Sequence, residues 1–248
     1  GHWGRSADPH DRFYSGTGSR DAAVVTPYVQ AVTAFLERLG HRPDVVDLGC
    51  GDFRVGAQIR PACARYTACD IVPALIAHHR QAHAHLDVDF RVLDLSADEL
   101  PPAEVVFVRQ VFQHLSNAQI AAALHKIQQT YRYLVLTEHL PAHEPFVPNL
   151  DKPAGRNIRH GIDSGVVLTH APFDLRPVQE QRLCEVPETG GQGVEQHGRF
   201  ACCPVANEDE HEARQRDQRI QALPRPFAHL LRQPVAPVGR HDGHRVDA

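Results

Sequence analysis

The segment Asp44-Val-Val-Asp-Leu-Gly-Cys-Gly-Asp-Phe-Arg-Val-Gly56 decides the fold of this chain. Apolar, β-branched residues lead into a glycine pair, and an amphipathic segment follows. This order predicts a buried strand over residues 45–48 that turns sharply into a short helix over residues 53–59. Glycines at such a turn let a ligand approach the backbone closely. The segment therefore predicts a strand, a ligand-binding turn and a helix in succession.

Charged residues around the turn separate two classes of nucleotide ligand. A dinucleotide requires the spacing G-x-G-x-x-G, which brings its pyrophosphate to the helix N-terminus, but Arg54 stands where the third glycine should be. Asp47 and Asp52 flank the turn, where they would repel a pyrophosphate and attract an ammonium group. The turn therefore favours S-adenosylmethionine (SAM), which has an amino-acid ammonium and no phosphate, over NAD(P).

Strands and helices alternate through most of the chain. Hydrophobic periodicity predicts helices over residues 21–39, 73–83 and after the cap Ser116-Asn117, and strands over residues 64–70, 88–93, 104–108, 133–137 and at the end of 173–186. This alternation is typical of an α/β fold, in which a Rossmann-like, doubly wound and mostly parallel sheet carries helices on both faces.

Acidic residues at two strand ends are suited to bind a nucleoside. Asp70 ends the second strand about 20 residues beyond the glycine turn, where a carboxylate accepts hydrogen bonds from ribose hydroxyls. Ile71 follows it and is expected to pack against the adenine. Asp94 and Leu95 close the third strand and offer a carboxylate for the adenine amino group and an apolar wall for its ring. The alternative role of each acid is a solvated turn or a helix cap.

The ends of the fourth and fifth strands carry the candidates for the chemistry. Ligands of open α/β sheets bind at the carboxyl ends of strands, so Arg109 and Gln110 should lie beside the reacting end of the bound ligand. A hydroxyl or a protonated amine that acts as the nucleophile requires a general base. Glu138, His139 and His114 are the candidates, in that order, because of their positions near these strand ends.

Composition limits the class of protein. A chain of 248 residues can hold one α/β domain with additional segments. Its formal charge of −4 gives no general attraction to nucleic acid or to an anionic membrane. The six cysteines show neither a CxxC pair nor a zinc spacing, so we expect reduced thiols, a cytoplasmic location and no metal site. No apolar run approaches the roughly 20 residues of a membrane span, and no signal peptide is expected.

The chain divides into three parts by composition. Residues 1–20 are rich in glycine and serine and are expected to form a flexible segment or a lid over the cofactor. Residues 21–188 are the expected SAM-binding domain, in which the irregular stretch 141–169 would be a loop that covers the substrate. Residues 189–248 are polar and charged without a sustained period, which predicts a poorly ordered ending.

Several of these segments together resemble the class I SAM-dependent methyltransferases. The turn is similar to motif I of that family, D-x-G-C-G-D, and the resemblance runs over residues 21–187. A bacterial subgroup with no assigned substrate is more narrowly similar in Arg109-Gln-Val-Phe-Gln-His-Leu-Ser-Asn117, Thr137-Glu-His-Leu-Pro141 and Phe146-Val-Pro-Asn-Leu-Asp-Lys-Pro153.

The resemblance implies an activity and a set of cofactor contacts. It implies methyl transfer from SAM to an unidentified small molecule, with S-adenosylhomocysteine (SAH) as the product. Cofactor contacts are expected around the turn at Asp47, Gly49, Cys50, Gly51, Asp52 and Phe53, in addition to the strand-end residues named above. The number of subunits is left open.

The C-terminal part departs from the family pattern. That family closes its sheet with a hairpin whose antiparallel seventh strand lies beside the fifth. After Glu188-Thr-Gly-Gly191 no β-rich run follows, and Arg199-Phe-Ala-Cys-Cys203 would be a poor substitute. A seventh strand is therefore doubtful, and its loss would leave a sheet edge exposed. This departure keeps a non-catalytic SAM-binding module as the alternative to an enzyme, ahead of an NAD(P)-dependent oxidoreductase.

Overall fold

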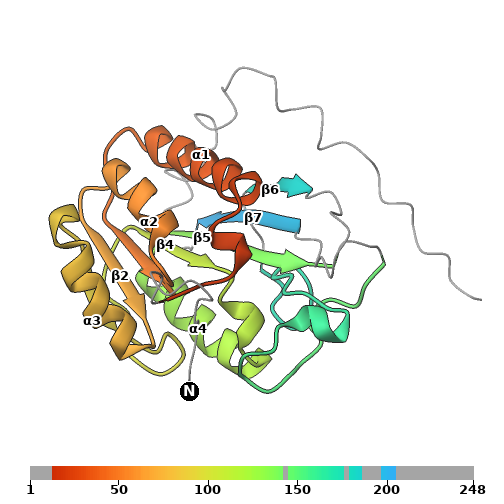
Figure 1. The fold of residues 1–248 in the computed structure, drawn as a ribbon. Helices are drawn as coiled ribbons and strands as arrows, with labels where there is room; N and C mark the ends of the chain where they lie inside the picture. The colour runs from red at the N-terminus through yellow and green to blue at the C-terminus, as the bar shows by residue number, and fades with distance from the viewer. Residues whose placement is uncertain (1–12, 142–144, 176–178, 186–196, 205–248) are drawn as a thin grey trace, which may run out of the picture. The chain divides into compact units, whose positions relative to one another are not determined.

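Seven strands form one sheet in the computed structural model, which describes residues 13–141, 145–175, 179–185 and 197–204 (Figure 1). The strand order is β3-β2-β1-β4-β5-β7-β6. The strands are β1 (Val45–Leu48), β2 (Tyr66–Asp70), β3 (Asp89–Val92), β4 (Val105–Arg109), β5 (Tyr133–Leu140), β6 (Gln179–Glu185) and β7 (His197–Pro204). Strands β1 to β5 pair in parallel, whereas β7 is antiparallel to both of its neighbours.

Helices lie on both faces of this sheet. In the described ranges the α-helices are α1 (Ala22–Arg38), α2 (Arg54–Ile59), α3 (Pro73–Ala82) and α4 (Asn117–Thr130), and the 3-10 helices are η1 (Thr17–Ser19), η2 (Arg60–Ala62), η3 (Ala84–Leu86), η4 (Phe112–His114) and η5 (Arg159–Ile162). Val45 and Val135 belong to an apolar cluster with residues of α1 and α2. Side chains adjacent to these along the same strands, such as Val46 and Leu134, lie on the opposite face of the sheet and pack with α4. The predicted α/β, Rossmann-like fold is confirmed.

Local signals fixed several element boundaries. Asp21 begins α1 by accepting a hydrogen bond from the Ala23 amide at 2.9 Å. Ser116 begins α4 with a capping box, in which its side chain accepts from the Gln119 amide while the Gln119 side chain accepts from the Ser116 amide. Both helices therefore start where the sequence predicted. None of the helices in the described ranges has the length and apolar character that crossing a bilayer requires.

The doubt about the seventh strand was wrong. Strand β7 includes residues 199–203 and pairs with β5 from one end to the other, from Tyr133 opposite Pro204 to Leu140 opposite His197. On its other side β7 pairs with β6. A strand inserted between two others forms hydrogen bonds along both edges, and such pairing overrides weak β propensity. The expected exposed edge is therefore not at β5. Residues 1–12, 189–196 and 205–248 of the predicted terminal segments lie outside the described residues.

The turn after β1 depends on glycine for two separate reasons. Gly49 has a φ of +85°, and a Cβ added there would lie 2.4 Å from Cγ2 of Val111. Gly40 has a similar φ of +77° but no heavy atom within 4 Å of such a Cβ. A side chain at position 49 would therefore cause both backbone strain and a steric clash, whereas a side chain at position 40 would cause backbone strain alone.

Replacing Gly49 with Ala should lower the free energy of unfolding more than replacing Gly40 with Ala. The excess should be about 1–3 kcal/mol, because only the Gly49 variant overpacks a neighbouring side chain. Urea denaturation of the two variants and the unaltered chain measures the difference. Equal losses would show that the contact with Val111 imposes no constraint.

Candidate active site

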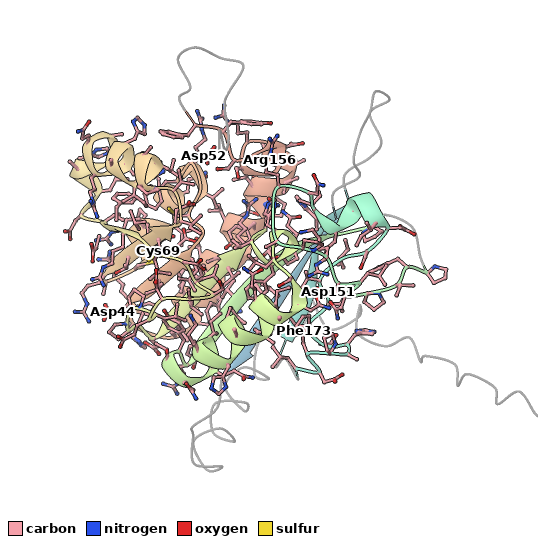
Figure 2. All side chains as sticks on the ribbon, turned by 90° about the horizontal axis from the view of Figure 1, so that it is seen from below. Asp44, Asp52, Cys69, Asp151, Arg156 and Phe173 are labelled. Atoms are coloured by element: carbon pink, nitrogen blue, oxygen red, sulfur yellow. The ribbon has the colours of Figure 1, made fainter. Side chains whose placement is uncertain are left out.

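The carboxyl ends of β1, β2 and β4 surround a pocket of about 200 Å³. Of the residues expected to contact cofactor or substrate, those that line it are Asp47, Gly49, Cys50, Gly51, Asp52, Asp70, Ile71, Asp94, Leu95, Arg109, Gln110 and His114. Phe53, Glu138 and His139 are not part of its lining. Figure 2 shows Asp52, which follows β1, and Asp44, which precedes it, at opposite ends of that strand. The site therefore lies at the sheet edge predicted from the strand ends.

Two side chains form hydrogen bonds with the backbone of Gly51. Its N–H donates to Oδ2 of Asp70 at 3.1 Å, and its carbonyl accepts from Nε2 of His79 at 2.7 Å. The other oxygen of Asp70 accepts from the Val72 amide at 3.0 Å. Burial raises the pKa of Asp70, and these backbone hydrogen bonds oppose the rise. Since a carboxylate has about four lone-pair positions, Asp70 keeps acceptor capacity for further hydroxyl groups.

Asp47 is a buried carboxylate inside the pocket. It is 7% exposed and its Oδ2 accepts from the Tyr66 hydroxyl at 3.0 Å. Burial raises the pKa of Asp47 to about 7, although the Tyr66 hydrogen bond and the charge of Arg109 lower it. A ligand cation beside Asp47 would favour the ionised form of the carboxyl group and offset part of the free energy that burying its charge costs.

The raised pKa of Asp47 predicts pH-dependent binding of a cationic ligand. The ammonium of SAH binds the ionised carboxylate, and with a pKa of about 7 most of that form is lost when the pH falls from 8 to 6. SAH affinity should therefore be about tenfold lower at pH 6 than at pH 8. Calorimetric titration at both pH values measures this change. The affinity of 5′-methylthioadenosine, which lacks the ammonium, should change little; an equal change would assign the effect to another group.

The described part of the N-terminal segment lies across this pocket. The Ser15 hydroxyl accepts from the Asp52 amide at 2.7 Å, beside the glycine turn. On the opposite side the guanidinium of Arg109 donates to the Gly18 carbonyl and, at 3.4 Å, to the Ser19 hydroxyl. Arg20 adds an ion pair to Asp52 with a 3.6 Å separation. The segment is thus attached to the ends of both β1 and β4.

The side of the pocket beyond β2 and β3 is more apolar. Ile71 is 61% exposed, which is high for a large aliphatic side chain, and it lines the pocket together with Leu95. Asp94 accepts hydrogen bonds from the Ser96 amide and hydroxyl at 2.8 and 2.6 Å, and these bonds lower its pKa. Asp94 is therefore ionised and partly engaged in a turn.

Phe53 lies elsewhere than expected. Its side chain is fully buried and contacts the rings of Phe90, at 4.9 Å between centroids, and Tyr66, at 5.8 Å. Its φ of +59° belongs to the left-handed region that the turn requires. Phe53 therefore packs the helix of the turn against the core, and it is not among the residues that line the pocket.

Glu138 supports the pocket from behind. Its buried carboxylate accepts from three consecutive backbone amides, those of Val111, Phe112 and Gln113, at 3.1, 2.7 and 3.2 Å. Burial raises the pKa of Glu138, and the three amides lower it. The net pKa of Glu138 is about 8, and the three converging N–H donors favour its ionised form. Glu138 therefore holds residues 109–115, here named the β4 wall, and its carboxylate is outside the pocket lining.

His139 also contacts this wall and does not line the pocket. Its Nε2 is 2.7 Å from Nε2 of Gln110, and the residue is 8% exposed. Gln110 itself has a φ of +57°, which is unusual for a residue with a Cβ and is characteristic of strained functional positions. The pair therefore orients the Gln110 side chain at the end of β4.

His114 is the one of the three base candidates that lines the pocket. Its Nδ1 is 3.3 Å from the Gly155 carbonyl. Because a carbonyl can only accept, the neutral ring carries its hydrogen on Nδ1 and leaves a lone pair on Nε2. Burial lowers the pKa of His114, the charge of Lys152 lowers it further, and hydrogen bonds to the backbone of Gly155 and Arg156 oppose both effects. His114 is therefore a neutral base at pH 7.

The described part of the 141–169 loop packs on the β4 wall and the start of α4. Asp151 accepts from the Asn117 amide at 2.7 Å, and Arg159 donates to the Leu115 carbonyl at 2.8 Å. The Gly155 amide donates to the His114 carbonyl at 2.9 Å. Figure 2 shows Asp151 and Arg156 of this loop with their side chains. The loop thus borders the wall that carries His114.

The pocket includes residues that the sequence did not indicate. Tyr28, Val111 and Gln113 are among them, whereas Ser15 and Ser19 belong to the segment that was expected to form a lid. Tyr28 occupies a helical position among core residues, and nothing in the sequence distinguished it from them. Val111 and Gln113 belong to the strand-four segment that is similar to the bacterial subgroup, which was a usable signal. Among the described residues, no group of three or more His, Cys, Asp and Glu side chains is placed to hold a metal ion.

Comparison with known proteins identifies the domain. Residues 46–132 match the model of a family described as a methyltransferase domain. Residues 46–132 thus form a methyltransferase domain. The matched residues begin in β1 and end just before β5. They include the glycine turn, Asp70, Asp94 and the β4 wall, so the matched residues supply most of the pocket lining.

Solved methyltransferase structures share the fold of this domain. N-methyltransferase NodS from Bradyrhizobium japonicum WM9, in complex with SAH, is 14% identical with a TM-score of 0.54, and the match covers 77% of this chain and 96% of NodS. Magnesium protoporphyrin IX methyltransferase from Synechocystis PCC 6803, with bound SAH, is 15% identical with a TM-score of 0.50, covering 73% and 84%. At such low sequence identities these matches show a shared fold only. No curated protein matches the sequence.

Proposed function

We propose that this methyltransferase domain transfers the methyl group of SAM to a small molecule that enters beside the β4 wall, with His114 as general base. The observation that carries the proposal is the pairing, in one pocket, of two buried carboxylates beside a glycine turn with a neutral histidine on the opposite wall. Asp47 and Asp70 suit a cofactor with an ammonium and ribose hydroxyls, since each keeps acceptor capacity inside the pocket.

The cofactor residues have separate roles in this proposal. Asp47 binds the ammonium, and the backbone of Gly49 to Asp52 follows the methionine end. Asp70 accepts the ribose hydroxyls, whereas Ile71 and Leu95 contact the adenine and Asp94 its amino group. Arg109, whose charge lowers the pKa of Asp47, faces the same end of the cofactor and can bind a carboxylate there.

The chemistry requires alignment and removal of one proton. SAM supplies an electrophilic methyl group on a sulfonium. Holding the acceptor in line with that group can contribute roughly 7–11 kcal/mol, and the β4 wall is fixed for this purpose by Glu138. The lone pair on Nε2 of His114 takes the proton of the acceptor, and a base of this kind adds typically 10²–10⁴-fold.

Two further expectations are part of the proposal. The N-terminal segment acts as a lid, which is supported by its contacts with Asp52 and Arg109 on both sides of the pocket. A cytoplasmic location is supported by the free thiols of Cys50, Cys63 and Cys69. Neither a nucleic acid nor a membrane is proposed as partner.

Thermal unfolding with SAM, SAH and NADH tests the cofactor assignment. A ligand present at about 100 times its dissociation constant stabilises the folded state by roughly 2.7 kcal/mol. We expect SAM and SAH to raise the unfolding temperature and NADH to leave it unchanged. A shift with NADH alone would support the oxidoreductase alternative. Binding of SAM with no methyl transfer to any fraction of a small-molecule extract would support the non-catalytic module.

A further inference from the structure

The charges of the pocket are divided between its two halves. The carboxylates that line it are Asp47, Asp52, Asp70 and Asp94, which lie within or shortly after β1, β2 and β3. Within the described residues that line the pocket, the β4 wall contributes Arg109 and His114 but no carboxylate. The carboxylates therefore lie on the side of the pocket proposed for the cofactor, whereas the β4 wall, beside which the methyl acceptor is proposed to enter, contributes none.

The charged residues that contact the β4 wall add no free carboxylate to the acceptor side of the pocket. Lys152 donates to the His114 carbonyl at 3.3 Å, and Arg159 donates to the Leu115 carbonyl at 2.8 Å. The two nearby acids are already committed to backbone amides outside the pocket lining: Glu138 to the three amides of the wall, and Asp151 to those of Asn117 and Lys152. A cationic acceptor would thus lose its hydration without meeting a counter-charge, which is costly.

His114 limits the acceptor in a second way. A carboxylate is already ionised at pH 7 and needs no base, whereas a hydroxyl must lose its proton as it attacks. The pocket provides an imidazole whose Nδ1 contacts the Gly155 carbonyl, which leaves Nε2 as the nitrogen that can take up a proton. The base therefore suits a hydroxyl group.

We infer that the methyl acceptor is a hydroxyl group on a small molecule that carries no positive charge. In this reaction the O–H bond breaks and its proton goes to Nε2 of His114. The oxygen forms a bond to the methyl carbon while the carbon–sulfur bond breaks, and the electron pair of that bond stays on sulfur. The products are a methyl ether and SAH. The inference rests on the proposed function.

Labelling of fractionated extracts tests the acceptor class. The full chain is incubated with SAM tritiated on the methyl group and three small-molecule pools: one retained on an anion exchanger, one retained on a cation exchanger and one retained on neither. We expect label in the anionic or the unretained pool. The label should stay non-volatile after mild alkali, because methyl ethers resist hydrolysis whereas methyl esters release methanol.

Other results of this labelling would overturn the inference. Label confined to the cation-exchange pool would indicate an amine acceptor, and alkali-volatile label would indicate a carboxylate. Both results would leave the proposed methyl transfer intact. Absence of label from every pool, with SAH binding retained, would overturn the proposed function together with the inference.

Substitutions of Gln110 test the electrostatic part directly. Gln110→Glu puts a carboxylate on the wall, and Gln110→Lys removes the same amide without adding negative charge. We expect Gln110→Glu to lower labelling of an anionic acceptor at least about tenfold more than Gln110→Lys. Gln128→Glu, on the exposed face of α4, should leave labelling unchanged. The SAH affinity of each variant shows whether the cofactor side of the pocket is intact. For an acceptor found in the anionic pool, equal losses in the two Gln110 variants would contradict the charge argument.

Discussion

Replacement of Asp47 by Asn is expected to weaken SAH binding at least about 30-fold. Loss of one partner from a buried charge pair costs about 2–5 kcal/mol, and the Asp47 carboxylate is 7% exposed. The substitution keeps the shape of the side chain and an oxygen that can accept from the Tyr66 hydroxyl, so the charge is the main change. Isothermal titration with SAH at pH 8, where the carboxylate is ionised, measures the effect.

Two comparisons separate the charge of Asp47 from its packing. The affinity of 5′-methylthioadenosine, which has the nucleoside but no amino acid, should stay within about threefold in the Asp47→Asn variant. Tyr66→Phe removes the hydroxyl that contacts Asp47 and leaves the charge in place, so its effect on SAH should be under about tenfold, as for one hydrogen bond. A parallel loss of 5′-methylthioadenosine binding would contradict the assignment of Asp47 to the ammonium.

The same substitution should make the chain more stable without ligand. Burial raises the pKa of Asp47 to about 7, so at pH 8 the folded chain holds a charge that the unfolded chain would place in water. Such a carboxylate lowers the free energy of unfolding as the pH rises above its unfolded pKa of about 4. Removing it therefore raises stability while it reduces binding. This opposition is typical of functional residues.

Strong local patterns made much of the fold predictable. The predicted strand 45–48 has the boundaries of β1, because a buried β-branched run followed directly by glycine leaves little freedom in its limits. Asp70 was placed correctly at the pocket because a strand end and a spacing suffice to position it. These features depend on residues close together in the sequence.

Features that depend on distant residues could not be read in the same way. Phe53 follows the glycine turn, but whether its ring faces the pocket or the core is decided by Phe90 and Tyr66, which come from other strands. Glu138 was placed at the right strand end, yet its role follows from three amides 25 to 27 residues earlier in the chain. Strand β7 likewise exists because β5 and β6 both pair with it.

Replacement of His114 by Ala should lower the rate of methyl transfer by about 10²–10⁴-fold, since a positioned general base contributes that much. The rate is measured as label transferred to the extract at saturating SAM. SAH affinity should stay within about threefold, because the carboxylates on the cofactor side of the pocket are unchanged. Burial lowers the pKa of His114, so the unaltered chain should keep its maximal rate as the pH falls to the ordinary imidazole value and lose it only below.

A matched histidine provides the control for this substitution. His125 is exposed on α4 and bonds only to Gln129 of the same helix among the contacts described for its ring, so His125→Ala should leave the rate unchanged. Free imidazole added to the His114→Ala chain should restore part of the rate, because it supplies the missing lone pair. If the rate falls together with SAH affinity and imidazole has no effect, His114 maintains the β4 wall and another group removes the proton. An unchanged rate would mean that the acceptor reacts without a base, which would also exclude the hydroxyl acceptor inferred from this wall.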